Sequence, residues 1–515
     1  MKYLTKTGKH TWHLDHRLVP EVRAMLAAMS SRMPVGGLVA RYTEVVDAVL
    51  KSGYPQPERY LGDRDWVPTF GGAEETLCEY PLHPKVQEFF DKFVGAYGHS
   101  SILELTGSPT VYSDNMSWWA AYLLFDSPLV CGQENSTRAV TRKGWPMARE
   151  CYLDAEEAEE IRDNGHVEVG SVHPLLAELD QQGMAIFEAE VDAWKVELQL
   201  PCLECTSIVG KGLVVRITGV DCPTCNNTGK KYPWMKDPQA FRPALDRARW
   251  ALPGTISTGA AFASHVRDRS RAIKDGLAFA QGSPQAVEMF EEIKAAYQAA
   301  VPGIGALGLR EAVYAADKLV EPEHLQVVTN LVNPLPVRSG GVRVNLDLRG
   351  KTSGVPRSSS RSYADPSWNY ARVDTTIQCS VAVARDWHRH RTFYPWTFRI
   401  VSKKGGFLLD SHYEPISDLG KEQIVGYFEL ARTAFDYFVS EGDHFRAMLC
   451  LPFGASVRMS ASAGLRDFLY TAHLRAHSHG ANFEYEEQAK LMLASVVDQL
   501  GPDLCETLKV VDPKQ

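Results

Sequence analysis

The sequence predicts an α+β protein of two tandem, similar domains, each a mixed sheet packed by long helices, with a small zinc-ribbon-like insertion in the first. Three observations lead to this prediction. The chain has 515 residues, more than one ordinary domain of roughly 100–200 residues contains. Residues 247–253 and 446–452 share one motif, Arg-Ala, three variable positions and Leu-Pro. Two Cys-x-x-Cys pairs, in residues 202–205 and 222–225, have the spacing of a four-cysteine metal site.

The composition is that of a folded protein, with 44% apolar and 23% charged residues. A net charge of -8 argues against a protein that coats nucleic acid through overall positive charge. The start of the chain does not resemble a signal peptide, and no run approaches the ~18 apolar residues of a spanning helix. Six of the ten cysteines are scattered, which favours reduced thiols. We therefore expect a cytoplasmic protein without a membrane partner.

Apolar spacing predicts packed helices over residues 20–52, 84–97 and 175–197. Residues 102–125 mix branched and aromatic residues with Ser, Thr and Asp as strands do, although residues 118–125 fit a helix equally well. Residues 333–367 are rich in Pro, Gly, Ser and Arg, which predicts a surface loop or, alternatively, a loop that contacts phosphate.

Each copy of the Leu-Pro motif follows an amphipathic helix and precedes a run of small residues that we expect to be helical. This shared context favours a duplication over chance. The predicted domains are residues 1–300 and 301–515, and residues 198–232 form the zinc insertion within the first.

The paired cysteines predict a closed tetrahedral zinc site, because two-residue spacing lets both thiolates of a pair reach one ion. Four sulfur ligands leave no open position, so the expected role is structural. The second pair also resembles the cysteine-rich repeats of Hsp40-type chaperones, but a structural loop is favoured since only one such set is present. The ligands are Cys202, Cys205, Cys222 and Cys225.

A dense group of basic residues follows the apolar run 381–384: residues 385–391 read Arg-Asp-Trp-His-Arg-His-Arg. Crowded cations repel one another unless an anion is bound between them, so this group predicts a ligand that carries phosphate. The alternative is a solvated basic surface.

At this segment the chain resembles the flavin-dependent thymidylate synthases. Residues 389–391, Arg-His-Arg, match the start of that family's signature, whereas its Ser and Asn continuation is missing. The first copy keeps the other end: residues 134–138, Glu-Asn-Ser-Thr-Arg, resemble Glu-x-Ser-x-Arg, and residues 126–128 replace Arg-His-Arg. Residues 98–104 resemble the family's Gly-His element that contacts flavin.

The downstream losses are complementary as well. Arg249 matches a substrate-phosphate arginine of the family, where the second copy has Met448. Arg475 matches the arginine that contacts the pyrimidine ring, where the first copy has Gly276. In the family each active site is assembled across subunits of a homotetramer. The resemblance therefore implies a homodimer with composite sites, each formed from parts of both copies.

The resemblance implies FAD, NADPH and methylenetetrahydrofolate as cofactors, and reductive methylation of dUMP at C5. Arg475 would be catalytic, stabilising negative charge on the pyrimidine. Substrate would be bound by Glu134, Ser136, Thr137, Arg138, Arg249 and Asp386. Cofactors would be bound by His99, Ser100, Ser101, Arg389, His390, Arg391, Arg466 and His479.

Three alternatives stay open. Asp386 replaces a family Gln, and an acidic acceptor would prefer an amino group, which favours dCMP as the substrate. A hydroxymethylating variant of the reaction is a further possibility. The third alternative is an inactive synthase scaffold that binds zinc and nucleic acid, although the net charge disfavours nucleic acid as a partner.

Overall fold

A computed structural model of the chain describes the larger part of both halves. The described residues are 3–15, 17–30, 37–53, 61, 83–96, 102, 105–106, 110–126, 130–135, 146–162, 168, 170–198, 200–201, 206–209, 213–216, 230–231, 242–264, 266–301, 327–328, 331–335, 341–348, 371–394, 396–476 and 482–501.

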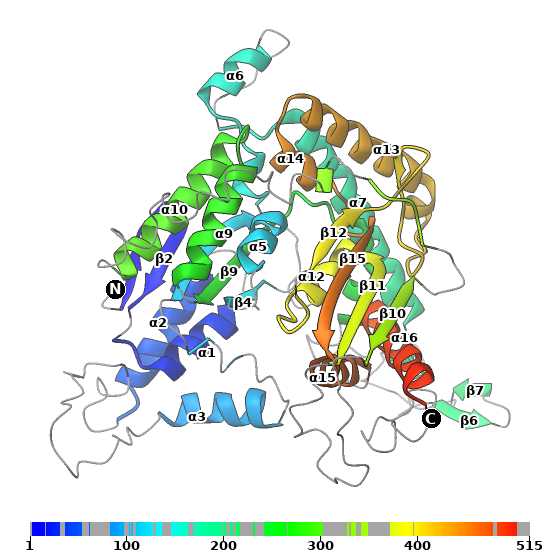
Figure 1. Ribbon diagram of the computed structural model, residues 1–515, viewed down its shortest axis with the longest axis horizontal. Helices are drawn as coiled ribbons and strands as arrows, with labels where there is room; N and C mark the ends of the chain where they lie inside the picture. Colours follow the sequence, from blue (N-terminus) through cyan, green and yellow to red (C-terminus); the bar gives the residue numbers. More distant parts are fainter. Residues whose placement is uncertain are drawn as a thin grey trace.

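The first half is built on a five-stranded sheet in the order β1-β2-β3-β9-β4 (Figure 1). Its strands are β1 (Leu4–Lys6), β2 (Thr11–Leu14), β3 (Thr110–Ser117), β4 (Val130–Glu134) and β9 (Ser257–Ser264). The second half has a four-stranded sheet in the order β10-β11-β15-β12. Its strands are β10 (Val342–Asp347), β11 (Arg372–Ser380), β12 (Thr397–Ile400) and β15 (Ser456–Gly464).

Helices surround both sheets, so the protein is α+β as the sequence predicts. In the first half they are α1 (Pro20–Ser30), α2 (Gly37–Leu50), α3 (Pro84–Phe90) with the π-helix η2 (Asp91–Ala96), α5 (Trp118–Phe125), the 3-10 helix η3 (Arg149–Cys151), α6 (Ala155–Arg162), α7 (Pro174–Glu197), α8 (Arg242–Ala248) with the 3-10 helix η5 (Arg249–Ala251), α9 (Val266–Phe279) and α10 (Pro284–Ala300). In the second half they are α12 (Val381–His388), α13 (Asp418–Ser440), α14 (His444–Leu449), α15 (Leu465–Ala476) and α16 (Phe483–Leu500).

The two halves repeat one topology. The elements β3-α5-β4-α7-α8-β9-α9-α10 have the same order and kind as β11-α12-β12-α13-α14-β15-α15-α16. The sheets agree too, since β2-β3-β9-β4 corresponds to β10-β11-β15-β12. The short Leu-Pro motif is therefore the visible remnant of a repeat that extends over each half.

The two copies of that motif face each other at the contact between the halves. The backbone N–H of Phe453 donates to the carbonyl of Leu252 at 2.8 Å, and that of Gly454 donates to Trp250 at 2.8 Å. A Cβ on Gly254 would lie 2.6 Å from the carbonyl oxygens of Leu449 and Leu451, so glycine permits this close approach. The repeated motif thus forms the junction of the two halves.

Long helices and aromatic rings extend the junction. Helix α7 of the first half packs along α13 of the second, and Figure 1 shows α7 on the side of the second half. Trp118 and Trp119 are fully buried in α5, and both rings contact Phe398 of β12. One apolar core therefore includes residues of both halves.

Several sequence predictions are confirmed. Helices occupy most of residues 20–52 and 84–97, and α7 spans the predicted 175–197. Residues 110–117 form a strand, and 118–125, which fitted either element, form a helix that Ser117 caps by accepting from the N–H of Ala120 at 3.2 Å.

Three predictions are wrong. The sheets are antiparallel rather than mixed: β3 and β4 share a direction, but β9 lies between them and runs opposite to both. The small residues after each Leu-Pro motif form strands β9 and β15, not helices, because they pair with neighbours on both sides. Part of the expected loop 333–367 is strand β10, whose period-two alternation of apolar and polar residues is typical of a strand.

The zinc prediction stays untested, because all four cysteines lie outside the described residues. The two ends of the segment that contains them lie side by side, because β5 (Leu200–Pro201) pairs with β8 (Lys230–Lys231). Within the segment, β6 (Thr206–Val209) pairs with β7 (Leu213–Arg216). This pairing suits an insertion that leaves the domain undisturbed. Within the described ranges, no helix combines the length and apolar character needed to cross a bilayer.

Candidate functional site

Helix α12 carries the basic group that the sequence singled out. Its N-terminus is capped by Ser380, whose Oγ accepts from the N–H of Val383 at 3.2 Å. The Ser380 N–H and Oγ both donate to the buried carboxylate of Glu484, at 2.8 and 2.7 Å. These bonds fix the start of the helix, and its apolar residues are buried beside β11 and β15. The polar side chains of the last turn thereby take defined positions.

Glu134, at the end of β4, joins the first copy to this helix. Its side chain is 3% exposed and forms ion pairs with Arg385 and, at 3.1 Å, with Arg389. Arg385 is 6% exposed, whereas Arg389 is 34% exposed. One carboxylate therefore serves two guanidinium groups, and the Arg389 group reaches the surface.

Arg249, in η5 of the first copy, pairs with Asp386 of α12. Both Nη atoms of Arg249 donate to Asp386 Oδ2, at 3.3 and 3.2 Å, and its Nε donates to the hydroxyl of Tyr413 at 3.4 Å. The arginine side chain is 1% exposed. Burial by itself lowers the pKa of Arg249, but Tyr413 and Asp386 outweigh it and raise the pKa. The guanidinium is thus charged and fully enclosed.

His390 and Arg475, which both belong to the second copy, contact each other. Arg475 of α15 donates from Nε to His390 Nε2 at 3.1 Å, so that ring nitrogen carries no proton. Burial and the charges of Arg475 and Arg389 lower the pKa of His390 well below its ordinary value. The Arg475 guanidinium also lies 5.2 Å from the centre of the Tyr485 ring. Both neighbours of Arg475 are therefore neutral.

These three groups form one connected polar cluster. The Tyr485 hydroxyl donates to the backbone carbonyl of Asp386 at 3.4 Å, which links the Arg475 pair to the Arg249 pair. Asp386, Arg389 and Arg249 all act electrostatically on Arg385. Because two arginines share Glu134 and Arg475 has neutral neighbours, the cluster has the character of an anion site. The groups suited to hold a phosphate-bearing cofactor are Arg389, His390 and Arg475.

The structure brings six of the predicted site residues together from both copies: Glu134, Arg249, Asp386, Arg389, His390 and Arg475. Arg391 is half-buried two positions beyond Arg389. Arg466 is not brought to the cluster. It is exposed nine positions before Arg475 on α15, and at about 100° per residue the two side chains point to opposite faces of the helix.

The remaining predicted residues lie outside the described part of the chain. They are His99, Ser100, Ser101, Ser136, Thr137, Arg138, His479, Cys202, Cys205, Cys222 and Cys225. Their roles stay predictions.

Asp386 and Arg249, for which the sequence predicted separate roles, form an ion pair. Asp386 was expected to select a base, and Arg249 to bind the substrate phosphate, yet in this structure the two side chains bind one another. A phosphate reaches Arg249 only if this pair opens. The same contact gives a physical reason for an acidic residue at this position: Asp386 neutralises the buried Arg249.

Sequence reasoning missed Tyr413 and Tyr485 as members of the cluster. Neither belongs to a recognisable motif, and Tyr485 reaches Arg475 only through the packing of α16 on α15. Arg385 stood inside the basic segment, but nothing in its spacing showed that it is buried whereas Arg389 is exposed.

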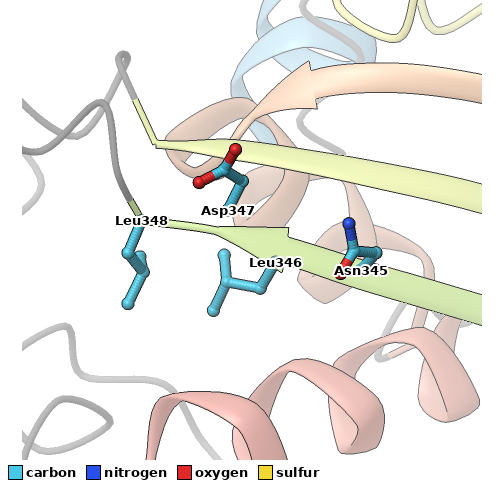
Figure 2. A pocket seen from close by; sticks show the side chains of 4 residues that line it. All are labelled: Asn345, Leu346, Asp347 and Leu348. Carbon is cyan, nitrogen blue, oxygen red and sulfur yellow. The ribbon is translucent and has the colours of Figure 1, made fainter.

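A separate pocket lies at the end of the edge strand β10, lined by Asn345, Leu346, Asp347 and Leu348 (Figure 2). Figure 2 shows Leu346 and Leu348 extending to one side of the strand and Asp347 to the other. The side-chain amide of Gln499 in α16 bonds the carbonyl of Val344 and the N–H of Leu346, each at 2.9 Å. This pocket is a feature of the sheet edge and contains none of the predicted site residues.

No protein-family model matches the chain, and no curated protein is significantly similar to it. The resemblance to flavin-dependent thymidylate synthases therefore depends on the sequence motifs alone.

Proposed function

We propose that this chain is a flavin-dependent enzyme that transfers a one-carbon unit to C5 of a pyrimidine deoxynucleotide monophosphate, converting dUMP to dTMP or carrying out a close variant. One observation carries the proposal. Glu134 and Arg249 of the first copy share a polar cluster with Asp386, Arg389, His390 and Arg475 of the second. Each copy lacks what the other supplies, which is the arrangement a composite site needs.

The described residues suit a flavin with its diphosphate. Arg389 is partly exposed and shares its carboxylate, so it can bind a phosphate oxygen without losing Glu134. His390 is neutral, and its ring lies beside an arginine and two aromatic rings. A reduced flavin supplies hydride when bound. In this proposal Glu134 positions the two arginines, and Arg385 holds the end of β4 against α12.

In the proposed reaction Arg475 stabilises the negative charge that develops on the pyrimidine. Its guanidinium is half-buried, oriented by His390 and the Tyr485 ring, and contacts no carboxylate among the residues that the structure describes. A guanidinium held in this way stabilises negative charge that develops on a pyrimidine carbonyl. Because its neighbours are neutral, its charge is available to the substrate.

Asp386 supports a second candidate substrate, dCMP. Its carboxylate is 19% exposed beside the cluster and accepts only hydrogen bonds when ionised. If the Arg249 pair opens on binding, Asp386 would accept from an exocyclic amino group. Product analysis distinguishes the two nucleotides.

The deciding experiment incubates the purified full chain with FAD, NADPH, methylenetetrahydrofolate and one nucleotide at a time: dUMP, dCMP, UMP or CMP. Product mass identifies both the nucleotide and the added group, methyl or hydroxymethyl. We expect a yellow protein that oxidises NADPH and methylates one deoxynucleotide. A colourless protein that shows no turnover and shifts oligonucleotides would establish the inactive scaffold instead.

A pair of variants tests the role of Arg475. Removing one preorganised charge-stabilising group reduces turnover by about 100- to 1,000-fold, so R475Q should lose that much kcat. Arg432, a surface arginine of α13 paired with Asp436, provides the matched control, and R432Q should keep wild-type kcat. Equal activity of R475Q and the wild type would remove Arg475 from the proposal.

The proposal includes a structural zinc ion on the four paired cysteines, a homodimer and a cytoplasmic location. Metal analysis of the purified chain should find one zinc ion per chain that thiol alkylation releases. Sedimentation should give twice the chain mass of 57.3 kDa.

A further inference from the structure

A second buried polar cluster lies beside the first. Asp410 and His412 come from the segment between β14 (Gly406–Phe407) and α13, and Glu484 comes from the first turn of α16. One potential ligand atom of each side chain lies within 4.8 Å of the others. Asp410 is 1% exposed, Glu484 is fully buried and the His412 side chain is 10% exposed. Two oxygen donors and one nitrogen donor thus converge in a shielded place.

Comparison with the first copy shows that the fold needs only one of these three side chains, the buried glutamate. There the cap of α5, Ser117, donates from its N–H and Oγ to buried Glu150, as Ser380 does to Glu484. The charged side chain that acts on Glu150 is a cation, Arg149, which lowers its pKa against the effect of burial. Glu484 instead faces a second carboxylate. Holding the helix start therefore explains Glu484 but does not explain Asp410 and His412.

The charges of the cluster do not balance. Two carboxylates face a single imidazole, and in the described part of the chain neither carboxylate is ion-paired with lysine or arginine. Burial and the charge of Asp410 raise the pKa of Glu484. Although burial opposes it, the hydrogen bond to Asp410 raises the pKa of His412 to about 9. A bound cation would supply the missing positive charge.

We propose that Asp410, His412 and Glu484 bind a divalent metal ion. Carboxylate oxygens with an imidazole nitrogen are ligands for ions such as Mn²⁺. Other bonds already orient the ligands: Ser456 Oγ donates to Asp410 Oδ2 at 3.1 Å, and the backbone N–H of His412 donates to Asp410 Oδ1 at 3.2 Å. The ion would replace the proton that His412 Nδ1 and Asp410 Oδ1 share at 2.6 Å.

Two contacts connect this site to the composite cluster. Tyr413 follows His412 and contacts Arg249, whereas Glu484 holds Ser380 at the start of α12. Metal binding would therefore fix both Tyr413, which contacts Arg249, and helix α12, which carries Asp386 and leads directly into Arg389 and His390. The inference concerns binding and does not depend on the proposed reaction.

Mn²⁺ is the probe, since four thiolates disfavour it and the predicted zinc site would not compete. The purified full chain, treated with chelator and desalted, is titrated with Mn²⁺, and the electron paramagnetic resonance signal of free Mn²⁺ is measured. We expect one bound Mn²⁺ per chain, and a dissociation constant at least tenfold higher in D410N and in H412A. H412A keeps the test valid if D410N does not fold.

The matched control is D180N. Asp180 is a half-buried carboxylate that accepts from a hydroxyl, that of Thr255 at 2.8 Å, and it belongs to neither cluster. It should bind Mn²⁺ as the wild type does. The proposal is overturned if the wild type retains no Mn²⁺, or if D410N and H412A bind it with wild-type affinity.

Discussion

Replacing Glu134 with Gln tests whether the ion pairs between the copies stabilise the fold. The substitution keeps the shape of the side chain but removes the charge that faces Arg385 and Arg389. Glu134 is 3% exposed and Arg385 is 6% exposed, so the lost partner leaves a guanidinium without counter-charge in the interior. Breaking a buried pair in this way costs about 3–5 kcal/mol. The ion pair with Arg389 adds little to this loss of free energy, because the Arg389 side chain is 34% exposed and stays solvated by water.

The expected loss can be measured as a change in melting temperature. The two halves share one core, so they should unfold together. With an unfolding entropy of about 2.1 cal/mol/K per residue over 515 residues, a loss of 3–5 kcal/mol lowers the melting temperature by about 3–5 °C. Differential scanning calorimetry of the wild type and E134Q measures this shift. D436N is the control, since the exposed pair of Asp436 with Arg432 contributes about 0–1 kcal/mol.

A double variant separates the buried charge from a general packing defect. If the loss in E134Q comes from an unpaired arginine, then E134Q/R385M removes that arginine and should melt at a higher temperature than E134Q alone. A melting temperature of E134Q within 1 °C of the wild type, or a double variant less stable than E134Q, would refute the reasoning.

Three further predictions follow from other parts of the molecule. The Leu175 N–H donates to His173 Nδ1 at 3.3 Å, and burial lowers the pKa of His173 to about 4, so the folded protein keeps this ring neutral. The unfolded chain binds a proton at this histidine more readily, so the folded state loses stability as pH falls from 6.5 towards 4. H173N, which caps without titrating, should match the wild type at pH 7 and exceed its stability by roughly 2 kcal/mol at pH 5, as measured by urea denaturation, and an equal pH response of both proteins would contradict this. G254A should lower the free energy of unfolding by about 1–3 kcal/mol or more in the same assay, since its methyl group would overlap two carbonyl oxygens at the junction. An unchanged urea midpoint would show that the two halves are not packed this closely at Gly254. G426A, on the exposed face of α13 with nothing within 4 Å, should raise stability by about 0.8–1 kcal/mol, and a loss there would contradict the helix-propensity argument.

Sequence patterns were sufficient where one local cause decides the structure. Apolar spacing predicted α7, and Pro174 at its start agrees with the helix beginning there. The Leu-Pro repeat indicated two related halves, because a duplication preserves the order of elements even after most side chains have changed. The basic segment of α12 and the acidic end of β4 were recognisable because charge and motif are local properties.

The tertiary structure decided every property that depends on a distant neighbour. The small residues of β9 are strand rather than helix because β3 and β4 lie on either side of them, and no local pattern reports this. Asp386 and Arg249 each carried a separate predicted role, yet only folding showed that they bind one another. Asp410 and His412 are two residues apart, but Glu484 lies far along the chain on α16, so only packing could reveal their cluster. The sequence by itself determined that the chain has two related halves and where charge is concentrated. The pairing of charges across the junction was decided by the tertiary structure, because the energy of a buried charge depends on what the rest of the chain places beside it.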